Sequence, residues 1–390
     1  MNKNIKFNLT ILIILILTNI CFLFSQFPVE LSRNQTTIPF ILEVENGSEF
    51  LLEFIAYSNT EWGEPNSESS TITIGIDGYW EDYNQDIILF NGTNLFNYKI
   101  SLGYLSEGSH TIEFKFDYNK SSVDADFVYI ESINIIDINE ISIDPDVFFH
   151  SPILYGRDLL SWNESVHTDI PLIMWHEISF SGNNKIIKYS IIFSNEDSRI
   201  GIGLSDLMYN YGRTTDIEWI YEVTLNNLGE IIYEKYQGPN HVHTEFNGEK
   251  YYKHPILKNA TLNCNFSDDG ISNFKFFLSP QLTLNLGYTR ETLMDNNPWT
   301  YAIMANELAR EGSYEAFPDP ETVEISDVRN YLYIEFDGEY IGNDIDYKLD
   351  IIVKLHGSCD KFYHDHNFYQ FENNFLEGLN RTIIELIDSF

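Results

Sequence analysis

Two carboxyl groups near the middle of the chain have the spacing that acid–base or polar-ligand chemistry requires. Arg213, Asp216 and Glu218 lie within residues 211–219, Tyr-Gly-Arg-Thr-Thr-Asp-Ile-Glu-Trp, which run into a strand-like stretch at 217–225. A regular strand would place Asp216 and Glu218 on one face, about 7 Å apart at the backbone. Such a pair is suited to glycoside hydrolysis, to cation binding or to a polyhydroxylated ligand. The structural alternative is that Arg213 pairs with one carboxylate and fixes the loop.

A second acidic pair, Glu196 and Asp197, follows the predicted strand 185–193. If folding brings the two pairs together, the four carboxyl groups would surround one cleft. Neighbouring acids raise one another's pKa, which suits an acid–base pair. The candidate catalytic residues are therefore Glu196, Asp197, Arg213, Asp216 and Glu218.

Metal ligands are a separate hypothesis. His241 and His243 are two residues apart and would share one face of a strand, and His254 follows in the same polar region. With His254 or His176 and a carboxylate, His241 and His243 could hold a transition metal. The oxygen-rich segments at 268–270 and 144–146 make calcium a candidate cation. No established ligand spacing is present, so the cofactor stays unknown.

The elements that must position these residues are mostly strands. Residues 27–138 contain short strand-like runs between Asn-Gly, Asp-Gly and Glu-Gly turns, which predicts an antiparallel β-sandwich. An acidic linker at 139–147 then leads to a larger β-rich domain at 148–390. Two or three helices are expected there. One near 298–311 is bounded by Asn297, Pro298 and Gly312, and one near 368–388 has helical apolar spacing.

The first 25 residues resemble a targeting segment, with Lys3 and Lys6 before an apolar run at 9–24. They predict a signal peptide or, if uncleaved, a membrane anchor, and thus a secreted or cell-surface protein. In an oxidising compartment Cys264 and Cys359 could form a disulfide. Asn-x-Ser/Thr triplets, typical of a glycoprotein, occur at Asn34, Asn46, Asn91, Asn119, Asn163, Asn259, Asn265 and Asn380.

The charge balance excludes one class of partner. The 390 residues include 23 Lys and Arg against 59 Asp and Glu, for a net charge of −36. Such an acidic protein repels phosphate backbones and anionic lipid, so nucleic-acid binding is excluded, and membrane contact is expected only through an uncleaved N-terminal segment. The charge favours divalent cations or basic partners, or it serves only to keep the protein soluble.

Two resemblances add to these inferences. Ile76-Asp-Gly-Tyr and Leu102-Gly-Tyr-Leu-Ser-Glu-Gly-Ser-His-Thr-Ile resemble a pattern in accessory carbohydrate-binding β-sandwich modules. The resemblance implies a structural role for His110. Nearby, Tyr79, Trp80 and Tyr83 could stack on a sugar ring, or could instead pack beneath the following strand.

The second resemblance covers about half of the chain. Ser194-Asn-Glu-Asp, Gly212-Arg-Thr-Thr-Asp-Ile-Glu-Trp, His254-Pro and Arg290-Glu-x-x-Met-Asp-x-Asn-Pro-Trp resemble a family of exported proteins of unknown activity. It implies common ancestry and no particular chemistry. The leading hypothesis is therefore an exported protein that binds an extracellular glycan or another cell-surface ligand. The alternatives are an extracellular carbohydrate-active enzyme that uses paired carboxylates and a structural cell-surface protein.

Overall fold

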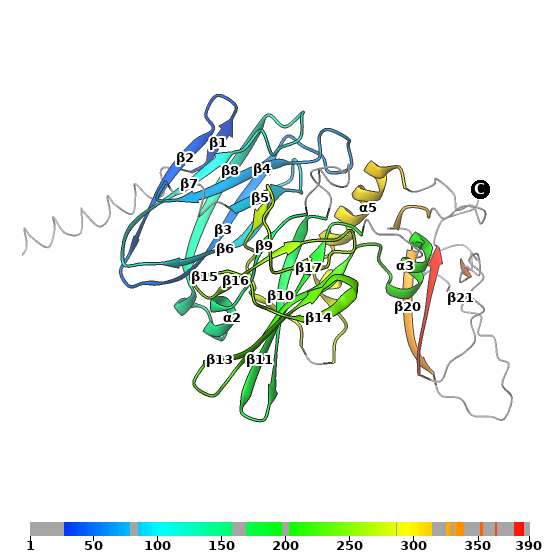
Figure 1. Cartoon of the computed structure of the whole chain (residues 1–390). Coiled ribbons are helices and arrows are strands. Elements are labelled where there is room, and N and C mark those ends of the chain that lie inside the picture. Colours follow the sequence, from blue (N-terminus) through cyan, green and yellow to red (C-terminus); the bar gives the residue numbers. More distant parts are fainter. Residues whose placement is uncertain are drawn as a thin grey trace, which may run out of the picture. The chain divides into compact units, whose positions relative to one another are not determined.

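The computed structural model describes residues 27–78, 85–157, 169–196, 203–285, 287–313, 325–328, 331–338, 352–353, 363–364 and 378–385. The chain is mostly β and divides into two compact units (Figure 1). Unit 1 contains Met1–Glu61, Asn66–Phe149 and Lys275–Ser279. Unit 2 contains Trp62–Pro65, His150–Phe274 and Pro280–Phe390.

Unit 1 is an antiparallel β-sandwich. One sheet has the order β1-β8-β3-β6, formed by Val29–Ser32, Phe127–Asp137, Ser48–Ser58 and Phe96–Leu105. The other has the order β2-β7-β4-β5, formed by Thr37–Val44, Gly108–Phe116, Ser70–Ile76 and Gln85–Leu89. The rings of Phe54 on β3 and Phe114 on β7 meet edge to face, 6.3 Å between centroids. Alternate residues of β7, Ile112, Phe114 and Phe116, are fully buried, as the strand period of two requires.

The predicted linker is part of this packing. Residues 139–147 contribute to a short 3-10 helix, η1 (Ile138–Glu140), and to α2 (Pro145–Phe149). Ile138 and Phe148 form a buried apolar cluster with Leu51. Ile141 and Ile143, both within the predicted linker, are partly buried against this cluster.

Unit 2 is built around a six-stranded sheet of order β14-β13-β12-β11-β10-β19. Its strands are Val242–Glu245, Ile231–Gly238, Ile217–Leu225, Asn184–Phe193, Pro171–Ser181 and Leu282–Thr283. The central strands are antiparallel, and β19 joins β10 in parallel. A smaller group pairs β15 (Lys250–Tyr251), β9 (Ile153–Tyr155) and β17 (Phe266–Ser267) with β16 (His254–Asn259).

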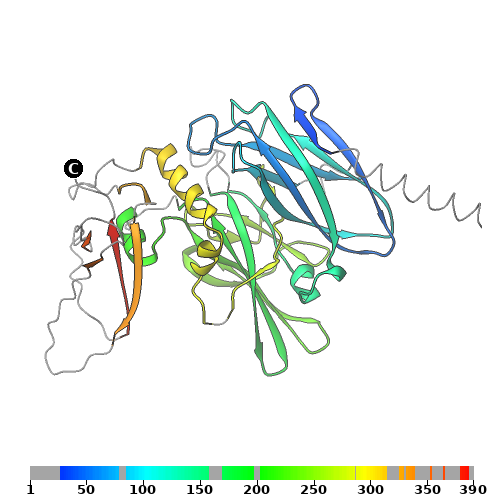
Figure 2. The same ribbon diagram turned by 180° about the vertical axis from the view of Figure 1, so that it is seen from behind.

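Helices adjoin one end of the central strands of this sheet. They are α3 (Leu204–Tyr211), α4 (Thr292–Asn296) and α5 (Trp299–Glu311). Figure 2 shows α5 in yellow beside the strands, where the backbone N–H of Thr214 donates to Met304 Sδ at 3.1 Å. Gly312 ends α5 in the left-handed conformation, with φ 68°. Asn297 donates its side-chain amide to Leu293 O of α4, so Pro298 takes the N-cap position of α5.

The segment near the C-terminus differs from its prediction. Residues 378–385, expected to lie in a helix at 368–388, form strand β23 (Gly378–Glu385). β23 pairs antiparallel with β20 (Tyr331–Gly338) over eight residue pairs. The helical spacing of Leu379 and Ile383 was misleading, since Thr382, Ile383 and Ile384 are consecutive β-branched residues that favour a strand once a partner exists.

Three short strands complete the described structure: β18 (Lys275–Phe276), β21 (Ile352–Val353) and β22 (Tyr363–His364). Within the described residues, no helix has the length and apolar character to cross a membrane. The predicted signal peptide or anchor at 1–25 lies outside the described residues.

Candidate functional site

The predicted acid pair lies at the start of β12 in unit 2. Asp216 immediately precedes the strand and Glu218 is its second residue, and they are only 5% and 8% exposed. The carbonyl oxygen of Asp216 accepts from the N–H of Phe193 at 3.0 Å, which fixes this end of β12 beside β11. The two acids are close enough for the charge of Asp216 to act on Glu218.

Residues from β13 and the turn that follows complete the site. Gln237 Nε2, on β13, donates to Glu218 Oε2. The same nitrogen lies 3.0 Å from His241 Nδ1, and that Nδ1 lies 3.5 Å from Glu218 Oε1. His241 ends the 3-10 helix η3 (Pro239–His241), and its other ring nitrogen lies 2.9 Å from the side-chain amide of Asn263. Gln237 and Asn263 were missed from sequence because neither side chain is distinctive outside its three-dimensional setting.

Burial dominates the electrostatics of both acids. Burial and, less strongly, the charge of Asp216 together raise the pKa of Glu218 to about 8, while the hydrogen bond from Gln237 acts in the opposite direction. Burial also raises the pKa of Asp216, against the positive charge of Arg213 and a hydrogen bond with Cys264. The raised pKa favours the protonated form of Glu218 near neutral pH, which makes it a potential proton donor.

Arg213 does not form the ion pair that the structural alternative required. Its Nε lies 3.2 Å from Glu291 Oε1, one Nη donates to the Thr215 carbonyl, and its guanidinium lies 5.0 Å from the Tyr211 ring centroid. Glu291, absent from the predicted set, belongs to the Arg290-Glu motif of the second resemblance. Arg290 donates to the Ile217 carbonyl at 2.5 Å. Both arginines thus act on the acid pair through their charge, with their donors directed to other groups.

The second predicted acid pair is only partly described. Glu196 follows β11 and is buried, with 8% exposure. Asp197 lies outside the described residues, as do the three aromatic residues proposed to stack on sugar, Tyr79, Trp80 and Tyr83. The four-carboxylate cleft therefore stays a prediction.

The three histidines of the metal hypothesis are not brought together. His241 contacts Glu218, whereas the ring of His243 packs edge-on against Trp219 at 5.0 Å. His254 is fully buried, with Nδ1 2.9 Å from the Ser151 carbonyl. In the part of the chain that the structure describes, no three His, Cys, Asp or Glu side chains are grouped to hold a metal ion. The histidine prediction was wrong. Residues 241–254 are close in sequence, but the turns between β13 and β16 give the three histidine side chains different partners.

The segments suggested for calcium also have protein partners. Asp268 accepts from the Tyr236 hydroxyl at 3.1 Å and from the Asn247 N–H at 2.8 Å. Asp144 accepts from the Asp146 N–H at 3.1 Å. Both carboxylates stabilise local turns and strand contacts.

Cys264 is buried, and Cys359, its predicted disulfide partner, lies outside the described residues, so the disulfide stays a prediction. The Cys264 thiol is hydrogen-bonded to Asp216, and the Asn259 amide lies 3.6 Å from its Sγ. The Cys264 side chain is therefore buried and hydrogen-bonded to one member of the acid pair.

The sequons fall into different environments. Asn34, Asn46 and Asn119 are exposed and Asn91 is half-buried. Asn259 and Asn265 are 1% and 2% exposed, so their side chains are buried in the folded chain. Asn163 lies outside the described residues, and Asn380 is part of β23.

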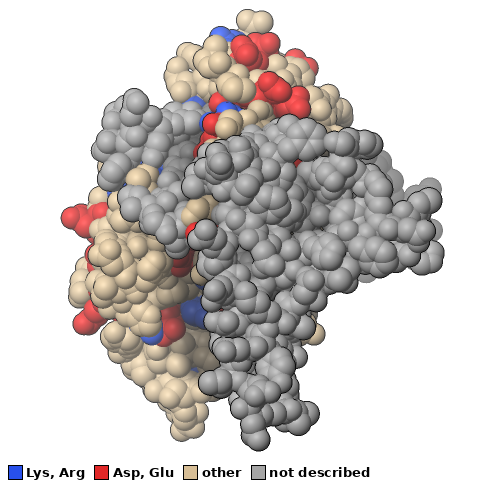
Figure 3. All heavy atoms as spheres, turned by 90° about the vertical axis from the view of Figure 1, so that its right-hand side faces the viewer, with Lys and Arg blue, Asp and Glu red and all other residues tan. Residues whose placement is uncertain are grey.

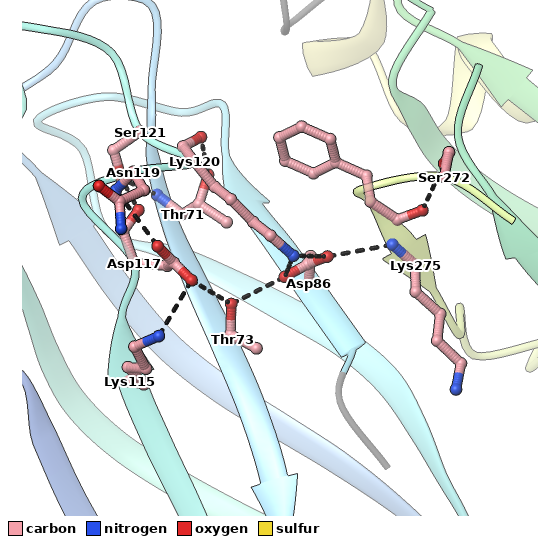
Figure 4. A network of polar contacts seen from close by, with 11 residues as sticks. Thr71, Thr73, Asp86, Lys115, Asp117, Asn119, Lys120, Ser121, Ser272 and Lys275 are labelled. Carbon is pink, nitrogen blue, oxygen red and sulfur yellow. Dashed lines mark hydrogen bonds and ion pairs between the residues drawn. The ribbon is translucent and has the colours of Figure 1, made fainter. Parts of the chain in front are cut away.

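Unit 1 contains a contrasting polar network around Asp86, on β5 (Figure 4). Lys120 Nζ lies 2.9 and 2.7 Å from its two carboxylate oxygens. Thr73 donates to it at 2.7 Å, and the backbone N–H of Lys275 at 3.0 Å. Thr73 also lies 3.5 Å from Asp117, which accepts from Lys115 at 3.2 Å. These contacts hold distant segments of unit 1 together.

His110, on β7, is bound on both sides of its ring. Nδ1 lies 2.7 Å from Asp77 Oδ2, and Nε2 lies 2.8 Å from the Ser106 carbonyl. Asp77 and Gly78 occupy the left-handed region in the turn after β4, with φ 54° and 75°. His110 therefore ties two turns of the sandwich together, in keeping with the structural role that the resemblance implied.

The acidic composition is visible on the surface. On the face drawn in Figure 3, red Asp and Glu side chains form larger patches than blue Lys and Arg side chains in the described part of the chain. This agrees with the net charge of −36.

No known protein-family profile matches the chain, and no curated protein matches it. Solved structures show low overall similarity. A family 36 carbohydrate-binding module in complex with calcium and xylotriose is 12% identical, covers 27% of this chain and 78% of that chain, and has a TM-score of 0.22. A family 35 carbohydrate-binding module from Clostridium thermocellum is 16% identical, with coverages of 26% and 70% and a TM-score of 0.21. The C-terminal domain of the sugar-binding protein EclA is 14% identical, with coverages of 28% and 76% and a TM-score of 0.21.

Proposed function

We propose that this chain acts on extracellular glycans and that unit 2 cleaves them, with Glu218 as the proton donor and Asp216 as the second carboxyl group. One observation carries the proposal: Glu218 is a buried carboxyl group beside a second one, and burial raises its pKa to about 8. In the described structure its side-chain contacts come from Gln237 and His241, with Arg213 directed to Glu291. Arg213 is thus paired with Glu291 and not with Glu218.

The roles follow from glycosidic bond chemistry. Cleavage requires a proton for the leaving oxygen and a negative charge near the positive sugar ring of the transition state. A protonated Glu218 supplies the first, and the adjacent Asp216, in its ionised form, supplies the second through space. Export through residues 1–25, and an accessory sugar-binding role for the sandwich at 27–138, belong to the same proposal.

The test is a hydrolysis screen of the intact secreted chain on polysaccharides and oligosaccharides, with Glu218→Gln as the variant. The neutral amide keeps the shape of the protonated acid but has no proton to transfer. We expect hydrolysis to fall by about 100-fold or more. Glu222→Gln is the matched control, because Glu222 lies four residues later on β12 and pairs with Lys235 at 3.0 Å. Its activity should stay unchanged.

Glycan binding without cleavage is the second candidate, favoured by the same uncompensated carboxyl groups, which can accept hydrogen bonds from sugar hydroxyls. A glycan array on the wild type and on the Asp216→Asn, Glu218→Gln double variant distinguishes the two. Binding that weakens in the double variant, with no hydrolysis by the wild type, would favour the binding function. Neither hydrolysis nor binding by the wild type would overturn both.

A further inference from the structure

We propose that His241 is the proton relay of this site: it exchanges protons between solvent and Glu218, while Gln237 and Asn263 hold its ring. The inference rests on the proposed role of Glu218 as an acid. It concerns how that acid regains its proton after each transfer, which the two carboxyl groups alone do not explain.

Glu218 and His241 differ strongly in their exposure to solvent although their side chains are close. The Glu218 side chain is 11% exposed and the His241 side chain 55% exposed, while Glu218 Oε1 and His241 Nδ1 are 3.5 Å apart. Solvent therefore reaches the imidazole far more easily than the carboxyl group. Imidazole is also the side chain suited to gain and lose protons near neutral pH.

The backbone at Asn240 and His241 has an unusual conformation. Asn240 and His241 both have φ 58°, in the left-handed region that residues with a Cβ rarely adopt. Two consecutive residues of this kind mark a strained turn, and such strain gathers where a side chain must be held for a task. This turn places the His241 ring against Gln237 and Asn263.

The neighbouring amides select one tautomer of the His241 imidazole. Gln237 Nε2 has two hydrogens: one is directed to Glu218 Oε2, and the other faces His241 Nδ1. A neutral imidazole accepts at one nitrogen only. Nδ1 is therefore the acceptor and Nε2 carries the hydrogen, which requires Asn263 to turn its amide oxygen toward Nε2. The unprotonated nitrogen thus faces the carboxyl group.

The proton balance is simple. After Glu218 gives its proton to a leaving oxygen it is a carboxylate. His241, protonated at Nδ1 from solvent, transfers that proton to Glu218 Oε1 and returns to its neutral form, and Gln237 again faces Nδ1. Asp216, Arg213 and Arg290 are the other charged groups acting on Glu218: Asp216 favours the protonated acid, and the two arginines favour the carboxylate.

The test is carbon-13 NMR of the glutamate side-chain carboxyls in the full chain, with the Glu218 resonance assigned by its loss in Glu218→Gln. At the midpoint of its titration, the exchange contribution to the Glu218 linewidth reports how fast the proton moves. We expect His241→Gln to increase that contribution several-fold, and added imidazole to reverse the increase. His243→Gln is the control, because His243 is exposed and packs on Trp219.

Equal linewidths in the wild type and His241→Gln would overturn the relay. A change that imidazole fails to reverse would also overturn it, because His241 would then only position Glu218. The measurement needs no substrate. A relay without glycan hydrolysis would count against the proposed function alone, and hydrolysis without the linewidth effect would count against the relay alone.

Discussion

Asp86 of unit 1 and Glu218 of unit 2 are both buried acids on strands, but they have opposite surroundings. Asp86 is in direct contact with the Lys120 ammonium, the Thr73 hydroxyl and the backbone N–H of Lys275. Glu218 is in contact with an amide and an imidazole and faces a second acid. Burial raises the pKa of both, but a bound cation opposes the effect only at Asp86.

The comparison separates a structural acid from one available for chemistry. The Asp86 carboxylate has its acceptors occupied, and its partner Lys275 lies 189 residues away in sequence, so its contacts close unit 1. Glu218 keeps an uncompensated carboxyl group in contact with an exposed histidine. Uncompensated burial destabilises a fold, so it marks a candidate functional residue.

The largest expected effect is the removal of the cation at Asp86. Lys120→Met would leave a fully buried carboxylate without its ion pair, since the Asp86 side chain is 0% exposed. We expect unit 1 to lose about 3–5 kcal/mol of stability. Hydrogen–deuterium exchange of peptides from β4 and β5 measures this loss.

Lys115→Met is the control for that experiment. Lys115 pairs with Asp117 at 3.2 Å, but its side chain is 37% exposed, so the cost should be about 0–1 kcal/mol. Equal losses in the two variants would contradict the distinction between a buried and a solvent-screened ion pair.

A smaller change in stability, of opposite sign, is expected when Glu218 is replaced. Its folded-state pKa is about 8, above the ordinary value of 4.5, so between these values the folded chain binds the extra proton and stability falls as pH rises. Glu218→Gln does not ionise. Its stability relative to the wild type should increase between pH 5 and pH 9 by a few kcal/mol, at about 1.4 kcal/mol per pKa unit.

Thermal unfolding at both pH values measures the difference in Tm between Glu218→Gln and wild type. Glu222→Gln, on the same strand but paired with Lys235, serves as the control. A Tm gap for Glu218→Gln that is the same at pH 5 and pH 9 would show that Glu218 is already ionised in the folded state.

The smallest change in stability is expected when the contact between His110 and Asp77 in unit 1 is removed. Burial lowers the pKa of His110, but hydrogen bonds to Asp77 and Ser106 and nearby negative charges outweigh it, so the pKa lies above 6.5. The stabilisation is complete below the ordinary pKa and is lost as pH rises through the higher folded-state value.

We therefore expect His110→Gln to destabilise unit 1 by about 1 kcal/mol at pH 5, after allowance for solvent screening. The loss should be smaller at pH 9. Hydrogen exchange of the peptide containing the Asp77-Gly78 turn reports the difference. A destabilisation by His110→Gln that grows with pH would contradict a charged His110.

The spacing of residues in the sequence predicted where the acid pair lies, but it did not predict which side chains contact that pair. The two-residue separation of Asp216 and Glu218 predicted that they lie near each other, because strand periodicity is local, and in the structure the charge of Asp216 acts on Glu218. Arg213 could not be assigned, since its partner Glu291 lies 78 residues later. Gln237, 19 residues from Glu218, has no signal of its own in the sequence. His254 was grouped with His241 by proximity alone, although it is buried against Ser151.

The sequence by itself determined the β character of the chain, the acidic charge and the strand that carries the acid pair, because these depend on composition and on a period of two residues. The tertiary structure decided which carboxyl group receives a cation, which histidine faces the acid pair and that residues 378–385 pair as a strand. The reason is that burial and long-range partners, rather than local spacing, set the ionisation of a side chain and the final choice between helix and strand.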